Sequence, residues 1–296
     1  MNITEFFLQN IEEVFFFYGL SFFSMGLAIL LEVGHCSELD FAKALKPLAG
    51  FGLVHGSHEW FEMILLYHPE IMQRPEAAWI YILRVVVLAS SFIMLVVFGA
   101  RLINGPQGRR TNIIILAAIL IIWALGLAFV IGSDLPPEKK ISSADVYTRY
   151  SLAIPGGVLS AWGLFLQRRR FIEAGMSSFG MDVVIAALAF GLYGGVGQFF
   201  VSSSSVFPSE YINTTMFVRL FGIPIQVFRM AMATVAAIFI IRSLRSFEVE
   251  NQRRIVLGNR LLDESHIRVR LHRRGVFLGE VATLLGGGQR DLIAEL

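Results

Sequence analysis

The chain has 296 residues, of which 55% are hydrophobic and 16% are charged, and its formal net charge is +2. A soluble domain is usually about 45–50% apolar and about 25% charged. The composition and a mean hydropathy of +0.64 therefore exclude an ordinary soluble protein and predict a membrane protein. The small net charge gives no reason to expect a nucleic-acid partner. Cys36 is the single cysteine, which excludes an internal disulfide and a cysteine-based metal motif.

Seven segments are apolar and long enough to cross a bilayer, which takes about 20 residues per helix. They are predicted over residues 11–32, 47–67, 78–100, 112–132, 149–167, 181–201 and 216–242. The fifth contains Pro155-Gly156-Gly157, which predicts a kink. The sequence thus predicts an all-α fold, a polytopic seven-transmembrane-helix bundle over residues 1–243. A tail over 244–296 is expected to begin as a helical extension of the last span.

Basic residues gather in one set of loops, which predicts the orientation. Arg101, Arg109 and Arg110 join the third and fourth spans, and Arg168, Arg169 and Arg170 follow the fifth. The positive-inside rule then places the N-terminus outside and the C-terminus in the cytoplasm. In the sixth span, four glycines predict a small-residue face for close helix packing: Gly191, Gly194, Gly195 and Gly197.

Four ionisable residues interrupt the second span: His55, His58, Glu59 and Glu62. Residues three and four apart share one face of a helix, so these side chains form a single stripe. An ionised side chain at the centre of a membrane helix costs about 2.5–3.5 kcal/mol on insertion scales. The stripe must therefore face the protein interior, a water cavity or a bound ligand, and it is the first candidate for a functional site.

Cations on other spans match the stripe in depth. Arg84 of the third span falls at the depth of Glu62 and Glu59, so we expect it to pair with one of these carboxylates. Arg229 of the seventh span is level with His55 and Glu59, and we expect these three to approach one another near the midplane. The candidate ligand-binding residues are His55, His58, Glu59, Glu62, Arg84, Gln226 and Arg229, with Gln198 as a further polar residue.

Three interpretations of this polar cluster stay open. It is an ion-pair network that fixes helix register, a binding pocket for a small ligand, ion or proton, or a metal or haem site. In the metal interpretation His55, His58 and Glu62 would be the ligands, with Glu59 as the alternative to Glu62. The spacing is not the His-Glu-x-x-His of zinc enzymes, and a bis-histidine haem would need a histidine from another helix. No cofactor is therefore specified.

Four stretches carry a resemblance to a known family: residues 22–32, 52–60, 219–229 and 241–250. Together they resemble the seven-helix membrane sensor region of bacterial sensor histidine kinases and related signalling proteins, over about residues 11–255. The resemblance implies a sensory input module of the bacterial plasma (inner) membrane, surrounded by the lipid bilayer, that relays a change through its last helix. It also implies a separate kinase or response regulator as partner, and a homodimer as a further option.

The kinase core of that family is not found in this sequence. A phosphoacceptor histidine box and the ATP-binding boxes are absent, so no catalytic residue is assigned. Two functions of other classes compete with the sensor hypothesis. One is a membrane redox or enzyme subunit that binds a metal or haem, and the other is a carrier of a small solute or of protons.

Overall fold

A computed structural model of the chain describes residues 2–35, 40–73, 77–173 and 177–245. The predicted tail lies outside the described residues, apart from positions 244 and 245. The described residues are mostly helical, and the extended pairing among them is an isolated bridge between Val201 and Asn213. The all-α prediction is confirmed for this part of the chain.

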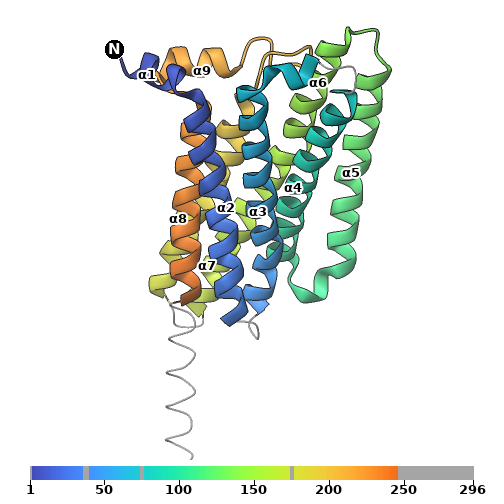
Figure 1. Cartoon of the computed structure of the whole chain (residues 1–296). Coiled ribbons are helices and arrows are strands. Elements are labelled where there is room, and N and C mark those ends of the chain that lie inside the picture. The colour runs from blue at the N-terminus through green and yellow to red at the C-terminus, as the bar shows by residue number, and fades with distance from the viewer. Residues whose placement is uncertain (1, 36–39, 74–76, 174–176, 246–296) are drawn as a thin grey trace, which may run out of the picture. The chain divides into compact units, whose positions relative to one another are not determined.

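The helices follow one another along the chain (Figure 1). They are α1 (Ile3–Gln9), α2 (Ile11–His35), α3 (Asp40–Tyr67), the 3₁₀ turn η1 (Pro69–Gln73), α4 (Ala78–Asn104), the 3₁₀ turn η3 (Pro106–Gly108), α5 (Arg109–Gly132), α6 (Pro137–Thr148), the π-helical η4 (Arg149–Ala153), α7 (Ile154–Glu173), α8 (Ser177–Leu192), the π-helical η5 (Tyr193–Gly197) and α9 (Thr214–Phe221). The segment 198–213 between η5 and α9 is a long loop at one end of the bundle (Figure 1). A further helix, Ile225–Arg245, is called the last helix below.

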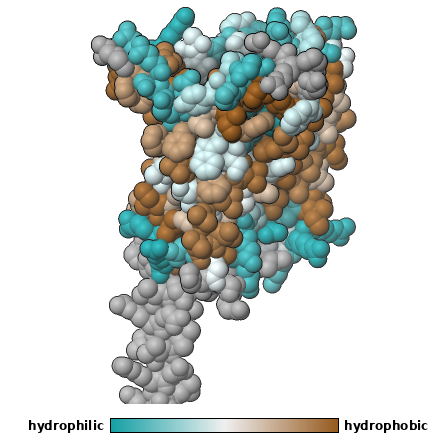
Figure 2. Space-filling model, in the orientation of Figure 1, coloured by the Kyte–Doolittle hydropathy of each residue, from teal (hydrophilic) through white to brown (hydrophobic). Residues whose placement is uncertain are grey.

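Five helices in the described part are long and apolar enough to cross a membrane. They are Ile11–Gly34, Ala78–Asn104, Arg109–Gly132, Gly180–Gly197 and Ile225–Arg245. Hydrophobic side chains form a band between hydrophilic ends of the molecule (Figure 2), as expected for a multi-pass membrane protein. Two other long helices lie in the same bundle. α3 packs against α2 and α4, and α7 packs against α4 and α8.

α2 and α3 approach each other at backbone distance. A Cβ on Gly52 would lie 2.7 Å from Cα of Gly26, and a Cβ on Gly56 would lie 2.6 Å from the carbonyl oxygen of Gly19. Glycines on both helices therefore permit this crossing, as small residues do between membrane helices. His55 lies between Gly52 and Gly56 in the sequence, so the crossing holds it against α2.

The start of the fifth predicted span differs from the prediction. The segment before Arg149, which lies between the fourth and fifth predicted spans, forms α6, and α6, η4 and α7 follow one another without a break. A π-helical turn, Arg149–Ala153, ends two residues before Pro155, close to the predicted kink. Proline cannot donate a backbone hydrogen bond, and π turns within α-helices occur frequently at functional sites.

The start of the seventh predicted span, 216–242, is wrong. α9 ends at Phe221, and its C-cap is Gly222, whose φ of +72° is a left-handed conformation that favours glycine. Pro224 then precedes the last helix. α9 lies beside α1 at one end of the bundle (Figure 1), where the Thr4 hydroxyl donates a hydrogen bond of 2.8 Å to the Gly222 carbonyl. Arg219 therefore belongs to α9 and not to a membrane span.

Gly194 and Gly195 provide a matched test of the small-residue face. A Cβ on Gly194 would lie 2.7 Å from Cα of Gly157 in α7, whereas one on Gly195 would meet nothing within 4 Å. We expect Gly194→Ala to lower the free energy of unfolding by about 1–3 kcal/mol, because overpacking forces the backbones apart. Gly195→Ala should leave it within about 1 kcal/mol of the wild type. Unfolding of the two purified variants in detergent checks this, and equal losses would contradict the close contact of α7 with η5.

Candidate functional site

The stripe on α3 faces the protein interior, as predicted. His55, His58 and Glu59 are each at most 1% exposed, whereas the Glu62 side chain is 17% exposed. Burial therefore increases along α3 from Glu62 toward His55. The polar cluster extends from the edge of the bundle into its core.

Hydroxyl groups from three helices surround the imidazole of His55. Its Nδ1 lies 3.2 Å from Oγ of Ser91 in α4, and its Nε2 lies 3.1 Å from the hydroxyl of Tyr193 in η5 and 3.3 Å from that of Tyr18 in α2. Ser91 donates its own proton to the Leu88 carbonyl at 2.7 Å, so its oxygen accepts from Nδ1–H. In this neutral tautomer Nε2 is the acceptor for the tyrosine hydroxyls. The sequence analysis missed these three hydroxyl residues.

Aromatic rings occupy the remaining space around His55. Phe51 stacks on the imidazole with ring centroids 5.2 Å apart, and the rings of Phe22 and Phe92 lie at 4.7 Å and 5.2 Å. An organic ligand at His55 would have to displace these rings, because protein cores are close-packed. A proton would not.

His58 and Glu59 are buried with polar atoms that lack hydrogen bonds. Both ring nitrogens of His58 and Oε1 of Glu59 have no hydrogen-bond partner among the residues that the structure describes. Oε1 of Glu59 lies 3.4 Å from Nε2 of His55 and 3.6 Å from Nδ1 of His58. Buried polar groups are nearly always paired, and each exception requires an explanation. A proton held between Glu59 and an imidazole would turn one of these approaches into a charge-assisted hydrogen bond.

The predicted ion pair of Arg84 is confirmed at the more exposed end of the stripe. Arg84 donates two hydrogen bonds of 2.6 Å to Glu62, from Nε to Oε1 and from Nη2 to Oε2. This is the bidentate geometry in which a guanidinium binds a carboxylate most strongly. Oε1 of Glu62 also lies 3.6 Å from Nε2 of His58, which joins the pair to the buried residues.

Arg149 of η4 is a buried cation that the sequence analysis did not assign to the site. It donates to Oδ2 of Asp145 at 3.0 Å and to Oε1 of Gln198 at 3.4 Å, and its charge acts electrostatically on Glu59. Gln198 therefore does contribute to the cluster, as predicted. The sequence did contain a signal for this pair. Arg149 begins an apolar segment, and Asp145 lies four residues before it, on the same face of a helix.

Arg229 does not pair with Glu59, which corrects the sequence prediction. Its Nε donates to the Gly197 carbonyl at 2.7 Å and its Nη2 donates to the Phe200 carbonyl at 3.1 Å. Carbonyls at a helix C-terminus lack intrahelical donors and attract cations. Arg229 therefore binds the end of the helix formed by α8 and η5, although its charge still acts on Tyr18.

The geometry does not favour the metal interpretation. In the described ranges, no three His, Cys, Asp or Glu side chains are grouped so that they could hold a metal ion. Gln226, a predicted ligand-binding residue, is half-buried and forms no hydrogen bond or ion pair with another described residue.

A polar cavity of about 180 Å³ borders the cluster. Its lining includes Arg84 and Asp145, together with Tyr81, Glu138, Ser142 and Ser202. Arg84 binds Glu62 and Asp145 binds Arg149, so both lining residues also contact the cluster. Polar groups thus continue from this cavity to Glu59 and His55.

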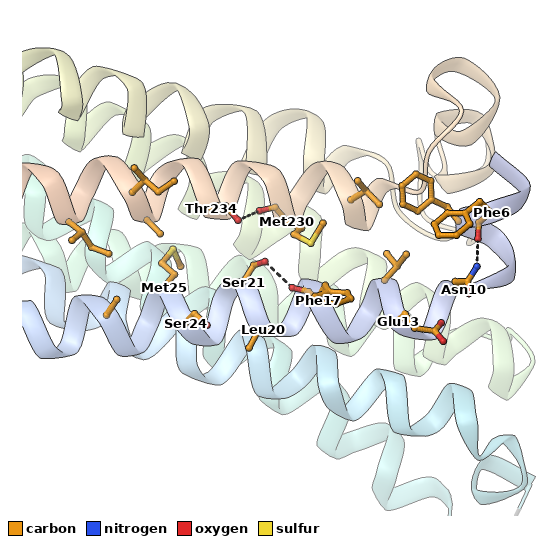
Figure 3. Close-up of a pocket in the computed structure, with 17 residues that line it drawn as sticks. Phe6, Asn10, Glu13, Phe17, Leu20, Ser21, Ser24, Met25, Met230 and Thr234 are labelled. Atoms are coloured by element: carbon orange, nitrogen blue, oxygen red, sulfur yellow. Dashed lines mark hydrogen bonds between the residues drawn. The ribbon is translucent and has the colours of Figure 1, made fainter. Parts of the chain in front are cut away.

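A second cavity, of about 770 Å³, is an apolar groove between α2 and the last helix (Figure 3). The hydroxyls of Ser21 and Thr234 in its walls donate to carbonyls of their own helices at 2.8 Å and 2.9 Å, which leaves the groove surface apolar. The groove separates the helix of Tyr18 from the helix of Arg229, so these helices are not closely packed along it.

No family model matches the chain, and no curated protein or solved structure matches it. The geometry of the polar cluster is therefore the basis for a functional proposal.

Proposed function

We propose that the chain is a sensory input module of a bacterial plasma (inner) membrane that takes up a proton at His58 and Glu59. In this proposal seven helices cross the bilayer, with α3 and the helix η4–α7 joining the five apolar ones. The N-terminus is outside and the C-terminus is cytoplasmic. The observation that carries the proposal is that buried atoms of His58 and Glu59 have no hydrogen-bond partner in the described part of the chain.

The charges of the cluster explain why a proton would change the structure. With neutral histidines, three arginines balance three carboxylates: Arg84, Arg149 and Arg229 against Glu59, Glu62 and Asp145. The other titratable groups that face the cluster are Tyr18, Tyr193 and His55. One added proton leaves a buried charge without compensation, which is costly unless the surroundings rearrange. Two arrangements that bind the proton differently are what a sensor requires.

The closed surroundings of His55 favour a sensor over a proton carrier. A carrier must give its site access to both sides of the membrane, whereas Phe22, Phe51 and Phe92 enclose His55. The groove beside the last helix gives that helix room to shift. Arg229 connects the last helix to η5, and Tyr193 of η5 contacts His55.

The proposal is tested by measuring the distance between α2 and the last helix at different pH values. Spin labels are attached at Leu31→Cys and Ala231→Cys, two exposed positions, in a Cys36→Ser background reconstituted in bilayers. We expect the distance distribution to change between pH 8 and pH 5, the range over which histidine ordinarily changes its charge.

His58→Gln should abolish this pH response while the protein stays folded. His68→Gln is the matched control, because His68 is exposed and pairs with Glu70 outside the cluster, and it should respond like the wild type. A wild-type distribution that does not depend on pH, or an unchanged response in His58→Gln, would overturn the proposal. Proton flux into liposomes that contain the protein would favour the carrier instead.

A further inference from the structure

A cavity where α4 turns into α5 combines cationic side chains with an apolar wall. It has a volume of about 570 Å³ and its lining comes from α3, α4, α5 and α7. Lys43, Arg101 and Arg109 line it, and none of the described lining residues is acidic. The electrostatic character of this cavity is therefore positive.

Two arginines and an asparagine amide in this cavity can donate hydrogen bonds to an anion. Arg101 and Arg109 are exposed, and neither forms an ion pair with a described residue. Oδ1 of Asn112 accepts from Nδ2 of Asn104 at 2.8 Å, which leaves the amide hydrogens of Asn112 as donors. The N-terminus of α5 has no side-chain cap, so the positive end of its dipole adds to the attraction.

The apolar wall consists of Val97, Ile113 and Leu116. Arg109 and Leu116 are seven residues apart on α5, so the wall extends about 10 Å from the cations toward the middle of the helix. α5 lies at the edge of the bundle (Figure 1), and Val130 is its one buried residue. The surface along α5 is therefore open to lipid where the helix crosses a bilayer.

We infer that this cavity binds an anionic phospholipid. The phosphate would accept hydrogen bonds from Arg101, Arg109 and the Asn112 amide, and one acyl chain would lie along the apolar wall. A guanidinium fork matches a phosphate in geometry and charge, and basic pockets between membrane helices bind anionic headgroups. A soluble phosphate would use the cations and leave the apolar wall without a partner, which favours the lipid. The site is independent of the His58–Glu59 cluster.

Native mass spectrometry of the purified protein with phosphatidylglycerol or phosphatidylcholine tests this inference. We expect one phosphatidylglycerol to bind in preference to phosphatidylcholine. Arg101→Gln and Arg109→Gln should each weaken its binding about fivefold, because each cation that contacts the headgroup contributes about a factor of five, and the double variant should weaken it about 30-fold. Arg110→Gln is the matched control. Arg110 is exposed and adjacent but does not line the cavity, so it should change binding less than about twofold.

Two further measurements separate a lipid from a soluble phosphate. Leu116→Trp fills the apolar wall without changing any charge and should also weaken phosphatidylglycerol binding. Inorganic phosphate should not displace the bound lipid. Equal losses for Arg109→Gln and Arg110→Gln would show a diffuse surface potential and overturn the site. Displacement by inorganic phosphate, or normal binding by Leu116→Trp, would overturn the lipid as its ligand.

Discussion

Arg149→Met should lower the free energy of unfolding by about 3–5 kcal/mol, the usual cost of removing one partner from a buried ion pair. The substitution leaves Asp145 without its cation and removes the positive charge that acts on buried Glu59. It also removes the hydrogen bond to Gln198, whose Nε2 has no hydrogen-bond partner among the described residues. Unfolding of the purified protein in mixed micelles measures the loss.

Arg169→Met is the matched control for this prediction. Arg169 pairs with Glu173 at the same spacing of four residues and at 2.8 Å, but the two side chains are 86% and 62% exposed. An exposed helix pair contributes about 0.3–0.5 kcal/mol, so Arg169→Met should be nearly neutral. Adding Asp145→Asn to Arg149→Met should recover part of the loss, because it removes the stranded charge. Equal losses at positions 149 and 169 would show that burial of Arg149 is not what matters.

The sequence alone was enough to predict the stripe of ionisable residues on α3 and one of its ion pairs. His55, His58, Glu59 and Glu62 share a face because helical geometry places residues three and four apart together. Arg84 was assigned to a carboxylate by depth, and the cost of an isolated charge in a membrane makes such a pairing reliable. Tyr18 and Tyr193 could not be assigned in this way, because tyrosines on apolar helices are common at positions with no functional role.

The depth of a residue along its helix axis was not enough to predict the partners of Arg229. Side chains at the same depth can point in different directions around their helices, and this direction depends on how the helices pack. The acceptors that Arg229 uses are backbone carbonyls of Gly197 and Phe200, which a pattern of side chains does not contain. Arg149 was missed because its segment was interpreted as the start of an apolar span.

The helix boundaries show a similar limit. Hydropathy continues through residues 216–242, so the break between α9 and the last helix was not predicted from apolar content. Gly222 and Pro224 were nevertheless visible, and a glycine close to a proline is a signal for a turn. α6 was missed for the opposite reason, because its polar composition is typical of a loop. Its packing against α5 explains why a helix forms there.

Arg229→Leu should lower the free energy of unfolding by about 3 kcal/mol, since hydrogen bonds to a charged group contribute about 1.5–3 kcal/mol each. The carbonyls of Gly197 and Phe200 would lose their donors, and amide hydrogen exchange should become faster over residues 198–202 and stay unchanged in α5. Arg229→Lys keeps the charge but not the fork that reaches two carbonyls, so it should lose about half as much. Arg219→Leu, at an exposed position of α9, should change stability by less than about 0.5 kcal/mol.

A double variant decides between carbonyl binding and the carboxylate pairing that depth alone suggested. If Arg229 binds the end of η5 and does not pair with Glu59, adding Glu59→Gln to Arg229→Leu removes no shared interaction. The two losses in stability should then add within about 0.5 kcal/mol. If Glu59 were the partner, Arg229→Leu would strand a buried carboxylate, and Glu59→Gln would restore much of the loss. Additive losses therefore place Arg229 on the carbonyls, and a rescue by Glu59→Gln would contradict the geometry on which the charge balance of the cluster depends.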